Sequence, residues 1–143
     1  MFKTLRSLFS GYRNLKKKNN PNPHEATFQM IHNGEAINVV VYTIRNFRDK
    51  LNNLVFKDDL NHEIGYRYVA KKGTSTFGFR SKVDIIFCNI NHSVIDFYEG
   101  IGPQKMTHYY PDAKFIYIFK QDFIRHFTIK INDILATKKM SQY

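Results

Sequence analysis

Short apolar runs separated by turn residues dominate the chain after its first 25 residues. Most runs are rich in Val, Ile, Phe and Tyr, and several alternate apolar with polar positions, which is typical of strands. The turn signals recur about every ten residues, as they do in small all-β domains. We predict strands at 26–31, 36–43, 66–70, 83–90, 93–98, 114–120 and 128–135, and short helices at 46–51 and 121–127.

The strongest local signal is a hairpin at the start of this region. His32-Asn33-Gly34-Glu35 separates the first two predicted strands. Asn-Gly is the preferred pair for a type I′ turn because both central residues of that turn need positive φ. A second hairpin is predicted where Asn91 and His92 separate the strands at 83–90 and 93–98.

Many short strands and few helices predict a mainly β fold. We expect a small curled antiparallel barrel or a jelly-roll-like sandwich with short helices, preceded by an N-terminal amphipathic helix. The chain has 143 residues, 43% of them hydrophobic. This is the size of one domain with a real hydrophobic core.

The first twenty residues follow a different pattern, in which apolar residues recur at helical spacing among basic ones, with no Asp or Glu. This segment holds six of the 22 Lys and Arg residues and therefore contributes +6 of the formal net charge of +10. We predict a basic amphipathic arm at 1–20. The residues expected to contact a membrane or a partner are Phe2, Lys3, Leu5, Arg6, Leu8, Phe9, Arg13, Lys16, Lys17 and Lys18.

The arm has several candidate partners. Burying a Leu or Phe contributes roughly 1.5 to 3 kcal/mol, and a basic residue near an anionic leaflet contributes about 1 kcal/mol. These values are enough for reversible attachment to an anionic membrane surface. The same helix also suits docking on its own domain, on a protein partner or on nucleic acid. Gly11 weakens the helix, which keeps a mobile arm open as a further alternative.

A linker follows the arm, because Pro21 and Pro23 remove backbone donors and push the residues before them toward extended conformations. The predicted organisation is therefore an arm at 1–20, a linker at 21–25, a single β-rich domain at 26–136 and a C-terminal tail at 137–143.

Composition restricts the cellular compartments in which we expect this protein. Charged or polar residues interrupt every apolar stretch, so neither a signal peptide nor a membrane-spanning segment is expected. Cys88 is the only cysteine, which excludes an internal disulfide and fits a reducing compartment. The predicted location is the cytoplasm, with the inner membrane face as the surface for the arm.

One segment carries a family resemblance. Residues 76–87 read Thr-Phe-Gly-Phe-Arg-Ser-Lys-Val-Asp-Ile-Ile-Phe. This resembles the signature of domain-of-unknown-function family 192, an uncharacterised prokaryotic family whose members typically read Thr-Phe-Gly-Met-Arg-Phe-Pro-Ile-Asp-Val-x-Phe. The matching positions are Thr76, Phe77, Gly78, Arg80, Asp84 and Phe87, while Phe79, Ser81 and Lys82 depart from the signature.

The resemblance extends loosely over residues 36–135, where Leu54-Val55-Phe56-Lys57 is similar to the family's Leu-Met-Phe-Arg. It implies a compact β domain of barrel or jelly-roll character, and it implies no activity because the family has none assigned. The arm lies outside it.

The matching residues also have a physical interpretation. Gly78 allows a backbone bend or a close approach, and Arg80 and Asp84 are placed to pair across that bend. Such a pair is either structural or part of a ligand site. The candidate ligand-binding residues are Thr76, Phe77, Gly78, Arg80, Asp84, His108 and Tyr109.

Motifs for catalysis and metal binding are missing from the sequence. The six histidines are scattered without the close pairs of a zinc site, and Cys88 lies in a predicted buried strand with no activating neighbour. Neither a nucleophile elbow nor a phosphate-binding glycine loop is present. We therefore expect no metal, no cofactor and no catalytic residue.

The sequence favours a non-enzymatic domain that binds a ligand or a protein through the loops around Gly78 and 100–110, and that the arm tethers to a membrane surface. An enzyme of unrecognised type stays open as one alternative. The stronger alternative is a nucleic-acid-binding protein, in which the arm acts together with an aromatic and basic strand face. That face would comprise Tyr66, Arg67, Tyr68, Lys71, Lys72, Arg80 and Lys82, with His108, Tyr109 and Tyr110 stacking on bases.

Overall fold

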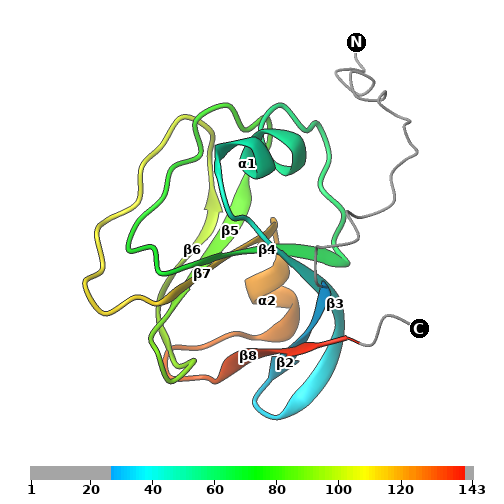
Figure 1. Ribbon diagram of the computed structural model, residues 1–143, viewed down its shortest axis with the longest axis vertical. Coiled ribbons are helices and arrows are strands. Elements are labelled where there is room, and N and C mark those ends of the chain that lie inside the picture. The colour runs from blue at the N-terminus through cyan, green and yellow to red at the C-terminus, as the bar shows by residue number, and fades with distance from the viewer. Residues whose placement is uncertain (1–26, 141–143) are drawn as a thin grey trace.

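The computed structural model describes residues 27–140, which form one curled sheet with two short helices (Figure 1). The predicted arm and linker lie outside the described residues. In chain order the elements are β2 (Thr27–His32), β3 (Glu35–Thr43), α1 (Phe47–Asn53), β4 (Ile64–Val69), β5 (Val83–Cys88), β6 (Val94–Ile101), β7 (Phe115–Lys120), α2 (Phe123–Phe127) and β8 (Leu135–Lys139).

The sheet has seven strands in the order β6-β5-β7-β4-β3-β2-β8. The mainly β prediction is confirmed, but the prediction of an antiparallel sheet is wrong at one pair, since β3 and β4 run parallel. A parallel pair needs a crossover connection, and the segment containing α1 supplies it.

The sheet curls without closing, so the predicted barrel is not formed, nor is a sandwich of two sheets. Its edge strands β6 and β8 approach each other at one end only, through the bridge between Ser93 and Ile134. There the N–H of Val94 donates to the carbonyl of Asp133 at 2.8 Å. The curled sheet wraps around α2 on its concave side (Figure 1).

Side chains from the two faces of the sheet form two hydrophobic clusters. Tyr117 and Phe119 of β7 pack with Phe123 and Ile124 of α2 in the first cluster. Ile116 and Ile118 of the same strand point the other way, into a second cluster that residues 54–60 after α1 help to form. The alternation follows the period of two of a strand, and it explains why every residue of β5 is buried.

The predicted first hairpin is confirmed. Asn33 and Gly34 have φ of 50° and 88°, as a type I′ turn requires. The turn is also tied to the segment before β8, because His32 Nε2 lies 2.8 Å from Asp133 Oδ2 and the N–H of Asn33 donates to the carbonyl of Ile134 at 2.8 Å.

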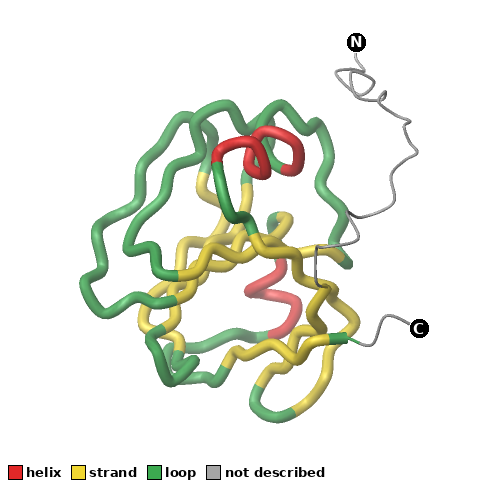
Figure 2. The backbone as a smooth tube through the Cα atoms, viewed as in Figure 1, coloured by secondary structure: helices red, strands yellow, loops and turns green. Residues whose placement is uncertain are grey.

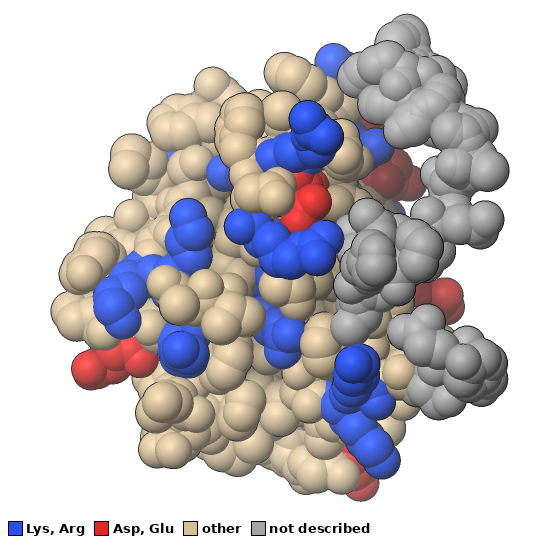
Figure 3. Space-filling view, viewed as in Figure 1, with Lys and Arg blue, Asp and Glu red and all other residues tan. Residues whose placement is uncertain are grey.

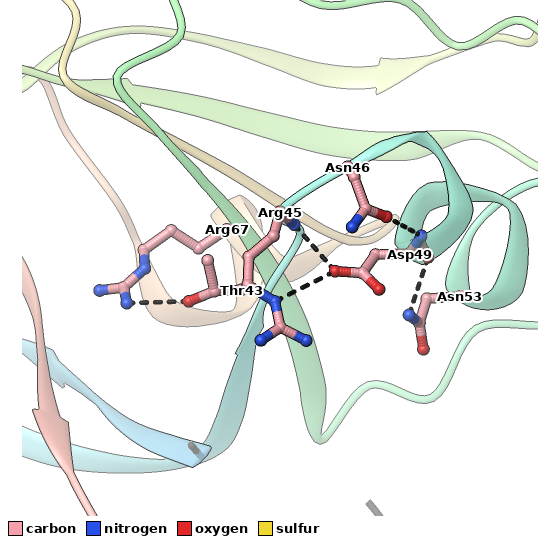
Figure 4. A network of polar contacts seen from close by, with 6 residues as sticks. All are labelled: Thr43, Arg45, Asn46, Asp49, Asn53 and Arg67. Carbon is pink, nitrogen blue, oxygen red and sulfur yellow. Dashed lines mark hydrogen bonds and ion pairs between the residues drawn. The ribbon is translucent and has the colours of Figure 1, made fainter. Parts of the chain in front are cut away.

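Both predicted helices are present. Asn46 caps α1 by accepting a hydrogen bond from the N–H of Asp49 at 2.9 Å, and Arg45 donates to the Asp49 carboxylate (Figure 4). Figure 4 also shows Asn53 donating to the carbonyl of Asp49, so α1 is held mainly by polar contacts. No residue of α1 is buried.

The predicted strand at 128–135 is wrong for most of its length. Thr128 and Asn132 have positive φ, and the Asp133 carboxylate accepts from the N–H of Lys130 at 2.9 Å to form a turn. β8 therefore begins at Leu135, and it continues to Lys139 within the segment predicted as a tail. Among residues 27–140, no helix is both long and apolar enough to cross a bilayer.

Candidate functional site

Two long loops run side by side along one end of the sheet, and they position the candidate site (Figure 2). The segments 70–82 and 102–114 are joined by five backbone hydrogen bonds of 2.7 to 3.1 Å. Three of these bonds, of 2.8 to 2.9 Å, are donated by the N–H groups of Thr76, Thr107 and Tyr110 to the carbonyls of Lys105, Thr74 and Lys72. A bridge between Ser75 and Met106 continues the same pairing. The loops are therefore held against each other by their own backbones.

Thr76, the first residue of the family-like segment, connects these loops through hydrogen bonds of its side chain. Its side chain is fully buried, and Oγ1 donates to the carbonyl of Gly102 at 2.7 Å while it accepts from the N–H of Lys105 at 3.0 Å. Both capacities of the hydroxyl are used within the protein, so Thr76 acts structurally.

Gly78 also connects neighbouring segments, through hydrogen bonds of its backbone. Its N–H donates to Gln104 Oε1 at 2.7 Å, and its carbonyl accepts from the N–H of Phe56 at 2.7 Å. Its φ is +85°, and a Cβ atom at this position would lie 2.7 Å from Val55 Cγ1. The expected close approach is present, but its neighbour is Val55.

The predicted pair of Arg80 and Asp84 does not form. Arg80 contacts the exposed carboxylate of Asp58 at 3.2 Å, and its guanidinium lies 5.6 Å from the ring centre of Phe56. Asp84 is 1% exposed and accepts from the N–H groups of Gly100 at 2.8 Å and Ile124 at 2.9 Å. Burial raises the pKa of Asp84, and these backbone hydrogen bonds act in the opposite direction.

A cleft of about 470 Å³ opens between α1 and the paired loops. Buried Tyr68 and Ile44 line it from the sheet side, and residues from α1 and both loops line the rest. The lining residues are Ile44, Arg45, Asn46, Phe47, Lys50, Tyr68, Lys71, Gly73, Thr74, Ser75, Met106, Thr107, His108 and Tyr109. A volume of this size is in the range of small-molecule sites, which is roughly 300 to 1,000 Å³.

The lining of the cleft is cationic. It includes Lys50, Lys71 and Arg45 and contains no Asp or Glu. Arg45 is paired with Asp49, whose carboxylate lies outside the lining (Figure 4). Lys50 Nζ lies 3.4 Å from both the carbonyl and the hydroxyl oxygen of Ser75, which are neutral acceptors at the long end of hydrogen bonding.

The two lysines act on each other electrostatically. The pKa of Lys50 is lowered, first by burial and second by the charge of Lys71. Lys71 Nζ lies 5.8 Å from the ring centre of Tyr68. On the face shown in Figure 3, Lys and Arg side chains outnumber Asp and Glu. An anion entering the cleft would relieve the repulsion between Lys50 and Lys71.

Tyr68 lines the cleft with its ring, and its hydroxyl group is buried. The side chain is 6% exposed, and its hydroxyl has no partner of hydrogen-bonding geometry among residues 27–140. Burial raises the pKa of Tyr68, while the Thr74 side chain, which lies close enough for a loose polar contact with the hydroxyl, lowers it. The hydroxyl oxygen exposes less than 1 Å² of surface, so it lies within the wall of the cleft and is closed to a ligand.

The structure separates the predicted ligand-binding residues into two groups. His108 and Tyr109 line the cleft, and Tyr109 is 72% exposed. Tyr110, the third member of the predicted stacking trio, turns inward and donates to Asp96 Oδ2 at 2.6 Å. Phe77 and the four other candidates lie outside the cleft lining.

The predicted basic and aromatic strand face does not assemble. Tyr66 packs with the second cluster. Arg67 donates to Thr43 (Figure 4). Arg67 also donates to Thr137, and its guanidinium lies 4.3 Å from the ring centre of Phe28. Lys72 donates to the carbonyl of Ala113 at 3.1 Å. Of the basic residues predicted for this face, only Lys71 lines the cleft.

Sequence reasoning missed Lys50, Phe47 and Met106. Asn46 marks the start of the helix that carries Phe47 and Lys50, so the sequence could have predicted that these two residues lie one helical turn apart. Their proximity to the loops at 71–75 and 106–109 depends on the parallel crossover, which has no local signal.

Metal and thiol chemistry find little support in the part of the chain that the structure describes. No group of three or more His, Cys, Asp or Glu residues there is arranged to hold a metal ion. Cys88 is fully buried, and burial raises the pKa of its thiol to about 12. A thiolate is therefore disfavoured at neutral pH, and Cys88 acts as a small core residue.

Comparisons with known proteins agree on the fold. No protein-family model matches the sequence, and no curated protein matches it. A crystal structure from Sinorhizobium meliloti 1021, described as a candidate transcription regulator, superposes with a TM-score of 0.66 at 8% identity and covers 83% of this chain and 98% of its own. A protein of unknown function from Novosphingobium aromaticivorans DSM 12444 gives 0.65 at 13% identity, covering 82% and 89%. At these identities the likeness shows a shared fold alone.

Proposed function

We propose that this chain is a non-enzymatic binding domain that takes a small anionic ligand in the cleft between α1 and the paired loops. The observation that carries the proposal is the charge of the lining, where Lys50 and Lys71 face one cavity that no carboxylate lines. Ion pairs with a ligand oxyanion would offset the repulsion between the two ammonium groups.

The neutral groups of the cleft support the same function. Ser75 and Thr74 bring hydroxyl groups into the lining. Such convergent polar groups in a partly apolar cavity are typical of ligand sites. The two loops are fixed to each other by backbone hydrogen bonds, so the site would need little rearrangement to bind.

Titration calorimetry of the full chain with sodium pyrophosphate, at low ionic strength, tests this function. We expect Lys50→Gln and Lys71→Gln each to weaken binding roughly tenfold, because each removes one charge-assisted contact. Lys130→Gln is the matched control, since it removes the same charge from an exposed position outside the cleft, and it should change the affinity less than about twofold.

Pyrophosphate will also meet the basic residues of the first twenty positions, so the site of binding must be read directly. Amide chemical shifts should change most at residues 71–75 and 106–109 in the wild type, and in Lys50→Gln the same changes should require about tenfold more pyrophosphate. Equal affinity for the wild type and both cleft variants would rule the function out.

For the arm, the proposal remains attachment to an anionic membrane surface, and it is supported by the basic and apolar pattern of residues 1–20. Co-sedimentation with vesicles of phosphatidylcholine and phosphatidylserine, comparing the full chain with one lacking residues 1–20, tests it. Unchanged lipid binding after the deletion would exclude the arm as the tether.

A further inference from the structure

The rim of the cleft carries apolar side chains that nothing in the described structure covers. Phe47 is 71% exposed, Met106 72% and Tyr109 72%. Single exposed apolar residues are ordinary on a protein surface. Here three of them line one cavity, with Phe47 coming from α1 and both Met106 and Tyr109 from the loop at 106–109. The cleft therefore combines a cationic interior with an aromatic and apolar rim.

This combination restricts the ligand. A simple inorganic anion would use Lys50 and Lys71 and leave the rim exposed. A purely apolar ligand would use the rim and leave the ammonium groups of Lys50 and Lys71 without an anionic partner. A ligand with a planar ring at one end and a phosphate at the other would satisfy both parts, because aromatic side chains stack on nucleobases and lysines bind phosphate oxygens.

We infer that the anionic ligand of this cleft is a nucleotide, with its phosphate on Lys50 and Lys71 and its base against Phe47 or Tyr109. The inference rests on the proposed function and names its ligand class. The volume of about 470 Å³ suits one nucleotide unit. The hydroxyl groups of Thr74 and Ser75 are the candidates for contacts with the sugar or the base edge.

The same chemistry has two sources, a free nucleotide or one unit of a single strand. The exposed rim is compatible with both, since a strand would pass over Phe47 and Tyr109 at the surface. The two sources are separated by competition, as described below.

Calorimetry of the full chain with ADP, adenosine and sodium pyrophosphate tests the ligand class. We expect ADP to bind at least tenfold more tightly than pyrophosphate and adenosine to bind weakly, because each fragment makes only one half of the contacts. The double variant that combines Phe47→Ala with Tyr109→Ala should bind ADP at least fivefold more weakly than the wild type does. Its affinity for pyrophosphate should stay within twofold of the wild-type affinity. Both side chains are exposed, so these variants are expected to fold.

Phe77→Ala is the matched control, since Phe77 is a half-exposed aromatic residue outside the cleft lining, and it should leave both affinities unchanged. Pyrophosphate binding that depends on Lys50, combined with ADP no tighter than pyrophosphate, would overturn the nucleotide while leaving the anion-binding function intact. Failure of both ligands to bind would overturn both.

Ten-residue oligothymidylate distinguishes the sources. If it displaces ADP and binds more tightly, the nucleotide belongs to a single strand. If it binds without displacing ADP, its contact lies outside the cleft and the ligand is a free nucleotide. Oligothymidylate is also tested on the double variant of Phe47→Ala and Tyr109→Ala. If it still binds there and still displaces ADP, the base does not stack on Phe47 or Tyr109.

Discussion

The carboxylate of Asp84 in β5 caps the helix α2 by accepting a hydrogen bond from the N–H of Ile124 at 2.9 Å. The residue at the N-cap position of α2, Asp122, makes no side-chain capping bond and has a φ of 82°. Asp84 also accepts from the N–H of Gly100 at 2.8 Å. One buried carboxylate therefore connects β5, the end of β6 and the helix on the concave side of the sheet.

Replacing Asp84 by Ala should destabilise the fold. The N–H groups of Gly100 and Ile124 would lose their acceptor in a site that is almost fully buried. We expect the free energy of unfolding to fall by about 3 kcal/mol, measured by urea denaturation. Asp112→Ala, at an exposed turn position, is the control and should change it by less than about 0.5 kcal/mol. Equal losses in the two variants would contradict this role.

The pH dependence of stability should carry a signature of the same carboxyl. Burial raises the pKa of Asp84 above its ordinary value of 3.8, so the folded protein holds this proton to higher pH than the unfolded chain. Stability contributed by Asp84 is therefore complete below pH 3.8 and declines as pH rises through the raised pKa. Asp84→Asn removes this titration. The free energy of unfolding of the wild type minus that of Asp84→Asn should fall as the pH rises from 3.8 through the raised pKa, and a rise over that interval would contradict the shift.

Much of the fold was predictable because the signals are local. Asn33-Gly34 specifies a tight turn through the φ that it allows, and Asn46 specifies a helix start through its side-chain oxygen. The parallel pairing of β3 with β4 was not predictable from runs of residues, because it depends on how the segment containing α1 crosses the sheet. The strand predicted at 128–135 failed because Ile129 and Ile131 alternate like a strand, while the backbone at Thr128 and Asn132 turns.

The site was less predictable than the fold. Arg80 and Asp84 are close in sequence and opposite in charge, but the partners of Asp84 are backbone groups 16 and 40 residues away. His108 and Tyr109 were predicted as site residues, but Lys50, which lies on α1 across the cleft from the loops, was not. Such a site is assembled from segments that only the tertiary fold brings together.

Gly78 should be intolerant of a side chain for two separable reasons. Its φ of +85° disfavours a Cβ, and that Cβ would lie 2.7 Å from Val55 Cγ1. Gly34 has a φ of +88°, and a Cβ there would have no atom within 4 Å, so Gly34→Ala measures the conformational cost alone. We expect Gly34→Ala to lower the free energy of unfolding by about 1 kcal/mol and Gly78→Ala by roughly 2 to 4 kcal/mol, since the second adds overpacking.

Gly102→Ala completes this comparison. A Cβ on Gly102 would have no atom within 4 Å, and the backbone there has no left-handed φ, so the substitution should be nearly neutral. Urea denaturation of the three variants measures these differences. Equal costs for Gly34→Ala and Gly78→Ala would mean that Val55 moves aside and that the contact is not restrictive.

Lys50 should titrate below its ordinary pKa of 10.5, because burial and then the charge of Lys71 favour the neutral amine. Nuclear magnetic resonance of the Lys50 side chain measures this directly. Lys71→Gln should raise the pKa of Lys50 without restoring it fully, since burial is the larger cause, and Lys130→Gln should leave it unchanged.

The lowered pKa of Lys50 also makes the stability of the fold depend on pH. The unfolded chain keeps the Lys50 proton to higher pH than the folded protein does, so the contribution of Lys50 to stability rises with pH between the lowered pKa and 10.5. Bound pyrophosphate favours the charged amine and should raise the pKa of Lys50, whereas a pKa that is unaffected by saturating pyrophosphate would separate Lys50 from the anion site.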